Sequence, residues 1–99
     1  MKPLSPVLMA AHKCKSLLRE SWYHWQRGSE GPCIADAINM AAPWEQPAVR
    51  SYLRLAFERY APNGLVHYND KPGRTHAQIM ELCEAVILDE ERRQARDGT

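Results

Sequence analysis

The fold is decided most clearly by residues 75–88, which read THAQIMELCEAVIL. Thr75 and Gln78 have the spacing of a capping box, in which the hydroxyl accepts from the Gln78 amide and the glutamine reaches back to the Thr75 amide. Apolar residues then recur at intervals of three and four, as on one face of an α-helix: Ile79, Leu82, Cys83, Val86 and Ile87. This stretch therefore predicts an amphipathic helix whose apolar face contacts a core.

Upstream of this helix, three further segments show helical periodicity. Ser5-Pro6 opens the first segment, because serine can cap free backbone amides and proline suits the first helical position. Its apolar stripe runs to about Gly28, and glycine commonly ends helices. The second segment ends at Pro43, and Pro47 starts the third. The predicted core residues of the second segment are Ile34, Ala37, Ile38 and Ala41, and those of the third are Val49, Leu53, Ala56 or Phe57, and Tyr60.

The pattern predicts an all-α fold, a compact four-helix domain with no significant sheet. We expect helices at about residues 6–27, 33–42, 47–60 and 75–92, and an ordered loop at residues 65–73. Since 99 residues leave room for one hydrophobic core, residues 1–99 are predicted to form a single domain. The stretch 89–99 is charged on all sides, so we expect it to run into solvent or fray.

The composition limits the cellular location and the classes of function that are expected. With 13 Lys and Arg against 12 Asp and Glu, the chain has no overall field that would gather nucleic acid or an anionic membrane. The apolar runs are too short to cross a bilayer, and the N-terminus does not read as a signal peptide. Three widely spaced cysteines indicate reduced thiols rather than a disulfide framework. We therefore expect a cytoplasmic protein.

Several motifs together resemble a known family. Their order along the chain is Trp25 near Gly28, Cys33 opening an alanine-rich helix, an arginine-bearing helix, Tyr68-Asn69-Asp70, and Arg74-Thr75 before an amphipathic helix. This order resembles a family of small uncharacterised actinobacterial and actinophage proteins, a domain of unknown function, from about Leu17 to Leu88. The resemblance implies a phage or actinobacterial setting and, if phage-encoded, the cytoplasm of the host, but it implies no activity.

Two regions are candidate interaction sites. Tyr68, Asn69, Asp70 and Arg74 could form a recognition corner, although Asn-Asp pairs commonly fix a turn by bonding the nearby backbone. Trp44 lies between two predicted helices, where its ring is expected to be at least partly exposed. Exposed tryptophan is typical of protein-interaction hot spots.

A DNA-binding alternative rests on the second and third predicted helices, which resemble a helix-turn-helix in outline. Arg50 and Arg54 lie near one side of the third helix, where a recognition helix would present them. Against this interpretation, Glu58 follows one turn after Arg54, and the turn lacks the usual glycine. Nucleic acid is therefore the second choice.

A thiol-dependent enzyme is the other alternative. Cys33 lies near a predicted helix N-terminus, which lowers a thiol pKa, and His67 or His76 with Asp70 could supply a base and an orienting carboxylate. Such triplets arise by chance in a chain of this composition, and the cysteines lack the close pairing of zinc ligands. We expect no catalytic residue, no metal and no cofactor.

These observations favour a small non-enzymatic protein-interaction module. It would act through a protein partner or as a homodimer, and in a phage setting it would modulate a host protein. The DNA-binding protein and the small-molecule-binding or thiol-dependent enzyme are the alternatives.

Overall fold

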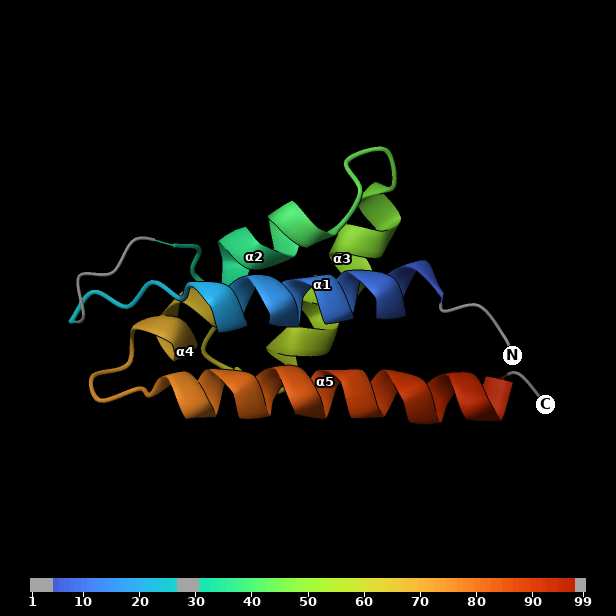
Figure 1. Ribbon diagram of the computed structural model, residues 1–99. Coiled ribbons are helices and arrows are strands. Elements are labelled where there is room, and N and C mark those ends of the chain that lie inside the picture. Colours follow the sequence, from blue (N-terminus) through green and yellow to red (C-terminus); the bar gives the residue numbers. More distant parts are fainter. Residues whose placement is uncertain (1–4, 27–30, 98–99) are drawn as a thin grey trace.

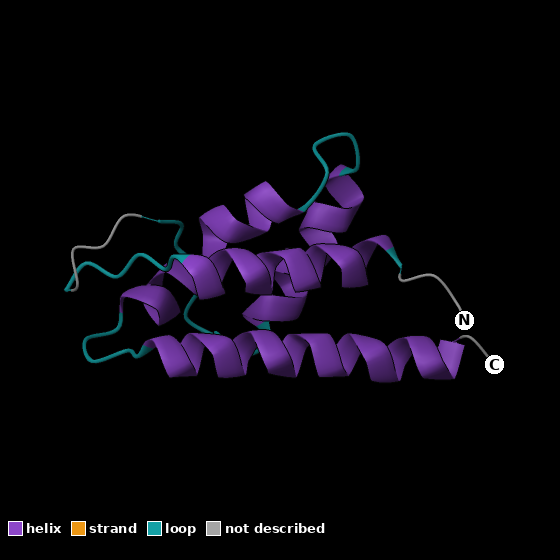
Figure 2. Cartoon of the chain, in the orientation of Figure 1, coloured by secondary structure: helices purple, strands orange, loops and turns teal. Residues whose placement is uncertain are grey.

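The described part of the chain folds into five helices. A computed structural model describes residues 5–26 and 31–97. The helices are α1 (Pro6–Glu20), α2 (Ile34–Ala41), α3 (Pro47–Glu58), α4 (Leu65–Asp70) and α5 (His76–Asp97). These residues contain no strand, as Figure 2 shows. The all-α prediction is confirmed, and the predicted count of four helices is wrong because α4 is a fifth.

Helix α1 is central to the arrangement, since it contacts α2, α3 and α5. Figure 1 shows α5 alongside α1 in the antiparallel direction, so the start of α1 and the end of α5 lie at the same end of the molecule. Helix α2 also contacts α3 and α4, and α3 reaches α5. The long helices give an elongated shape of 45 × 24 × 23 Å.

The core is built from the apolar faces that the periodicity predicted. On α2 and α5 every predicted core residue is buried: Ile34, Ala37, Ile38, Ala41, Ile79, Leu82, Cys83, Val86 and Ile87. On α3, Leu53 and Phe57 are buried as well. Tyr60, which the pattern also placed inside, is 40% exposed because α3 ends at Glu58 and Tyr60 lies in the following turn.

Two predicted helix starts are confirmed by their caps. The Leu8 amide donates to Ser5 Oγ at 3.1 Å, with proline in the first turn. The Gln78 amide donates to Thr75 Oγ1 at 3.1 Å, and the Thr75 amide donates to Gln78 Oε1 at 3.0 Å. Each bond satisfies an amide that has no partner within its own helix.

Helix α1 is shorter than its apolar stripe predicts. It ends at Glu20 rather than near residue 27, because Ser21 is extended at φ −159° and ψ 114°. The predicted stop at Gly28 lies outside the described residues. Residues 21–24 run on without regular secondary structure, so Trp22 and Trp25 do not share a helical face as the periodicity suggests. Hydrogen bonds from Trp22, His24 and Trp25 to residues 69–71 hold this stretch and override its helical pattern.

The predicted loop at residues 65–73 contains helix α4. Its six residues begin after Gly64, which has a positive φ of 100° and turns the chain into the helix. Leu65 and Asn69, four residues apart, are buried on one side. The segment is a weak helix former, so the expectation of a loop fails because tertiary contacts stabilise the helix.

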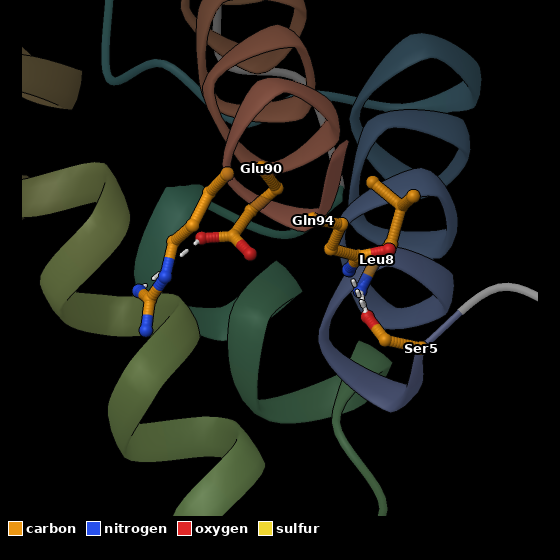
Figure 3. Close-up of polar contacts among 5 residues, drawn as sticks. Ser5, Leu8, Glu90 and Gln94 are labelled. Atoms are coloured by element: carbon orange, nitrogen blue, oxygen red, sulfur yellow. Dashed lines mark hydrogen bonds and ion pairs between the residues drawn. The ribbon is translucent and has the colours of Figure 1, made fainter. Parts of the chain in front are cut away.

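Helix α5 extends to Asp97, beyond the predicted end at residue 92. Figure 3 shows the reason: Gln94 on α5 points to the start of α1, where its side-chain amide donates to Ser5 Oγ. One turn earlier, the Glu90 side chain is only 5% exposed and lies 4.0 Å from the Arg93 guanidinium. The bond to Ser5 and the burial of Glu90 keep the charged end of the helix against the body of the protein.

Candidate functional site

A buried polar cluster joins the chain after α1 to α4, and Asn69 lies at its centre. The side chain of Asn69 is buried, and its Oδ1 accepts from Trp22 Nε1 at 2.7 Å and from the Ile34 amide at 3.2 Å. Its Nδ2 donates to the Tyr23 carbonyl and to Asp70 Oδ1, both at 3.0 Å. Asn69 therefore uses two acceptor positions and both donor hydrogens inside the chain.

Two neighbouring aromatic rings extend this Asn69 cluster. The ring of His24 is buried; its Nδ1 accepts from the Gln26 amide at 3.2 Å, and its Nε2 lies 3.0 Å from the Lys71 carbonyl. Because a carbonyl can only accept, the hydrogen is assigned to Nε2. Trp25 Nε1 donates to the Asp70 carbonyl at 2.6 Å. These hydrogen bonds therefore hold residues 22–26 against the end of α4.

Two residues that follow α4 complete the cluster. The Arg74 guanidinium lies 3.7 Å from the centroid of the Tyr68 ring, and Arg74 Nε donates to the Tyr68 carbonyl at 2.9 Å. His76 Nε2 lies 2.7 Å from the Leu18 carbonyl, and its ring stacks on Trp22 with centroids 5.9 Å apart. The Arg74 contacts hold the chain before α5 against α4, and the His76 contacts connect the start of α5 to the end of α1 and to Trp22.

The structure brings together four of the five predicted interaction residues. Asn69 is buried, while Tyr68, Asp70 and Arg74 are half-buried at its edge. The hydrogen bonds of Asn69 run to the chain itself, so they support the interpretation in which the Asn-Asp pair fixes the backbone. The cluster positions the segment after α1, α4 and the start of α5 relative to one another.

The fifth predicted residue, Trp44, lies apart in the turn between α2 and α3. Its side chain is 79% exposed, in agreement with the prediction from its position. The turn is closed by a hydrogen bond from the Gln46 amide to the Pro43 carbonyl at 3.0 Å. Pro43 and Gln46, on either side of Trp44 in the chain, help to line a cavity of about 390 Å³. Its other lining residues are Pro6, Met9, Ala10, Lys13 and Ala41. We call Trp44 and these lining residues the Trp44 surface.

The Trp44 surface combines an apolar floor with one cationic group. Met9, on α1, is 58% exposed at this cavity, and Ala10 and Ala41 are buried beneath it. Lys13 is exposed at the same cavity and forms no ion pair within the described residues. The sequence does not indicate this cavity, because its two walls are about thirty residues apart in the chain and show no local pattern.

The arginines of the DNA-binding alternative lie on α3. Arg54 Nε lies 2.9 Å from Glu58 Oε1, one turn later, so its charge is partly matched within the helix. Arg50 is half-buried in the first turn of α3. Helices α2 and α3 contact each other, but these positions alone do not form a basic stripe.

The residues of the thiol-enzyme alternative are not joined to one another in the part of the chain that the structure describes. Cys33 caps α2, with its sulfur accepting from the Asp36 amide at 3.5 Å. Partial burial raises the pKa of Cys33, although the amide bond opposes this effect, so the expected lowering of its pKa is wrong. In the described residues no hydrogen bond joins Cys33 to His67, His76 or Asp70. Cys14 and Cys83 are buried in the core, and all three cysteines are free thiols.

The described residues contain no group of three or more histidine, cysteine or acidic side chains placed to hold a metal ion. No helix in this part of the chain is both long enough and apolar enough to cross a membrane.

These features define a small all-α domain in which a buried asparagine cluster and an α1–α5 pair organise shorter helices. The chain belongs to a protein family of unknown function, DUF6197, whose model matches residues 9–89. Comparisons with curated proteins and with solved structures found no match. The expected membership of an uncharacterised family is confirmed, and the actinobacterial or phage setting stays a prediction.

Proposed function

We propose that the protein is a non-enzymatic protein-interaction module that binds its partner through the Trp44 surface. The observation that carries this proposal is the 79% exposure of Trp44 beside a largely apolar cavity. An indole exposed to water on this turn gains apolar burial when a partner covers it. The cavity beside it offers room for an apolar side chain of that partner.

The positive charge at the cavity indicates which charged residue the partner carries. Lys13 lies at the edge of the cavity, and no carboxylate among the described residues pairs with it. A partner segment with an apolar side chain in the cavity and a nearby Asp or Glu would complement both features. We therefore propose a segment of a different protein, with apolar and acidic residues side by side, as the occupant.

The proposed setting is the cytoplasm, where the three free thiols of this chain would stay reduced. In the phage setting that the sequence resemblance implies, the partner would be a host protein.

The test uses the full chain, tagged and purified from host lysate with and without nuclease. We expect a stoichiometric, nuclease-resistant partner that is lost with Trp44→Ala and with Lys13→Glu. Leu55→Ala is the matched control, because Leu55 is also a large exposed apolar residue, at 61%, but lies on α3 away from the cavity lining. With the purified partner, Trp44→Ala should weaken binding about thirtyfold, equivalent to about 2 kcal/mol at a hot spot.

Three outcomes would contradict this proposal. The first is a partner retained equally by Trp44→Ala and Leu55→Ala. The second is self-association that depends on Trp44 in the absence of any other protein, which would make a second copy the occupant. The third is material that disappears with nuclease and with Arg50→Ala/Arg54→Ala, which would favour the DNA-binding alternative.

A further inference from the structure

A second cavity lies at the other end of α3, against the C-terminal half of α5. It has a volume of about 610 Å³ and is lined by Arg59, Asp89, Arg92, Arg93, Ala95 and Arg96. Arg59 caps the C-terminus of α3, and the other residues come from α5. We call this the arginine cavity.

The arginine cavity carries an excess of positive charge. The lining contains four arginines and one carboxylate, that of Asp89, which gives the lining residues a formal charge of +3. Glu90, 4.0 Å from the Arg93 guanidinium, lowers the formal charge of this region to +2. Arg93 is partly engaged elsewhere, because its guanidinium lies 4.5 Å from the centroid of the Tyr52 ring and 4.0 Å from Glu90 Oε1. Arg59 and Arg92 form no ion pair with the described residues.

Helix dipoles explain only part of this clustering. A cation near a helix C-terminus is stabilised, which accounts for Arg59 at the end of α3 and for Arg96 in the last turn of α5. Arg92 lies a turn earlier, where the dipole effect has fallen off, yet it lines the same cavity. Repulsion among charges gathered in one hollow is relieved by an anion bound between them.

We propose that the arginine cavity binds a small ligand that carries two or more linked phosphate groups. The planar guanidinium fork matches the oxygens of a phosphate in a bidentate manner and keeps its charge at every physiological pH. A cavity of about 610 Å³ falls within the usual size of ligand sites and accommodates such a ligand.

The arrangement favours a small ligand over a nucleic acid backbone. Nucleic acid surfaces spread many phosphate contacts along a stripe, and their affinity depends on that number. Here the arginines converge on one hollow, while Arg54 on α3 is paired with Glu58 and the whole chain has a formal charge of only +1.

Asp89 provides a specific test of this site. Its Oδ2 accepts a hydrogen bond from the Tyr60 hydroxyl, which holds the carboxylate at the cavity. A fixed negative charge there opposes the binding of an anion, so its removal should increase the affinity. A cluster with a purely structural role would show no such gain.

The experiment titrates the full-length protein with inorganic tripolyphosphate, followed by calorimetry and by NMR shifts of the arginine Nε–H groups. We expect saturable binding that moves the signals of Arg59, Arg92 and Arg96. Arg92→Gln/Arg96→Gln should weaken it about tenfold or more, because each lost charge-assisted contact lowers the affinity. Asp89→Asn should strengthen it about threefold or more, as expected when a nearby like charge is removed.

The matched controls remove one positive and one negative charge at exposed positions outside the arginine cavity. Arg19→Gln removes an exposed arginine on α1, and Glu81→Gln removes an exposed carboxylate earlier on α5. Each should alter the affinity by less than about twofold because exposed charges at a distance are screened by salt. Absence of saturable binding would overturn the proposal, as would equal losses in the Arg19 control. Tight binding of a short DNA duplex without binding of tripolyphosphate would also overturn it.

Discussion

Among single residues, Asn69 joins three parts of the chain that are far apart in sequence. Asn69→Ala would leave the indole N–H of Trp22 and the Ile34 amide without their partner in a buried site. We expect the free energy of unfolding to fall by about 2–4 kcal/mol, since each buried donor without a partner costs about 1–3 kcal/mol. Urea denaturation followed by circular dichroism measures the change.

The control for this prediction is Asn39→Ala, which removes the same side chain from an exposed position on α2. It should change stability by no more than about 0.5 kcal/mol. If Asn69→Ala were as mild as Asn39→Ala, the Asn69 cluster would not organise the fold in the way described above.

Unlike the fully hydrogen-bonded Asn69, Tyr52 has a buried hydroxyl with no hydrogen-bond partner among the described residues. Tyr52→Phe removes this hydroxyl and keeps the ring that faces the Arg93 guanidinium. We expect the melting temperature to rise, with a gain of about 1 kcal/mol, because a desolvated polar group is lost. Tyr23→Phe is the comparison, because Tyr23 is 40% exposed and its hydroxyl already faces water, and it should have a smaller effect. A marked loss of stability in Tyr52→Phe would show that the hydroxyl has a partner.

At the scale of elements, helix α4 depends on the backbone of Gly64. With φ 100° and ψ 158°, Gly64 occupies a region that is almost restricted to glycine. A Cβ at this position would meet no atom within 4 Å, so any cost of Gly64→Ala comes from the backbone alone. We expect a loss of about 1–3 kcal/mol. Amide hydrogen exchange should also become faster at Tyr68, whose amide donates to the Gly64 carbonyl.

Asn63→Ala is the neighbouring control for Gly64→Ala, because Asn63 is exposed and has no positive φ. It should leave both the unfolding free energy and the exchange at Tyr68 nearly unchanged. Equal effects of the two substitutions would mean that the glycine conformation does not limit the formation of α4.

The elements differ in how far the sequence could predict them. The caps at Ser5 and Thr75 involve residues three apart, so local patterns were sufficient to identify these helix starts. The end of α1 was not predictable, because the bonds that hold Trp22 and His24 lead to residues about 47 positions away. Helix α4 was missed for a similar reason, since its stability comes from contacts with α2 rather than from its own propensity.

The same distinction applies to the candidate site. The exposure of Trp44 could be predicted because a tryptophan in a short turn between two helices has few neighbours to cover it. The cavity of the Trp44 surface and the arginine cavity could not be predicted. Each is formed between segments that are far apart in the chain, and hydrophobic periodicity does not encode how such segments are placed. Arg59 and Arg92 carry no signal in sequence beyond their charge.

At the scale of the whole molecule, the core contains two thiols that link stability to alkaline pH. Burial raises the pKa of Cys83 to about 12, and burial together with the proximity of Cys83 raises the pKa of Cys14 further. In the unfolded chain these thiols ionise near pH 8.5. Above about pH 8.5 the folded state therefore keeps protons that the unfolded state releases, and this difference persists up to the folded pKa.

The sign of this linkage predicts that the protein loses stability as the solution becomes alkaline. The contribution of the two protonated thiols is complete below about pH 8.5, and each thiol then lowers the unfolding free energy by up to about 1.4 kcal/mol per pH unit. Urea denaturation from pH 7 to 10.5, with a reducing agent present, measures the slope. Cys14→Ala/Cys83→Ala should be less stable at pH 7 because it leaves cavities, but its alkaline slope should be shallower by up to about 3 kcal/mol per pH unit. Should the double variant be too unstable, Cys83→Ala alone should show about half of that change in slope. Identical slopes in all variants would mean that the thiols are not protected in the folded core.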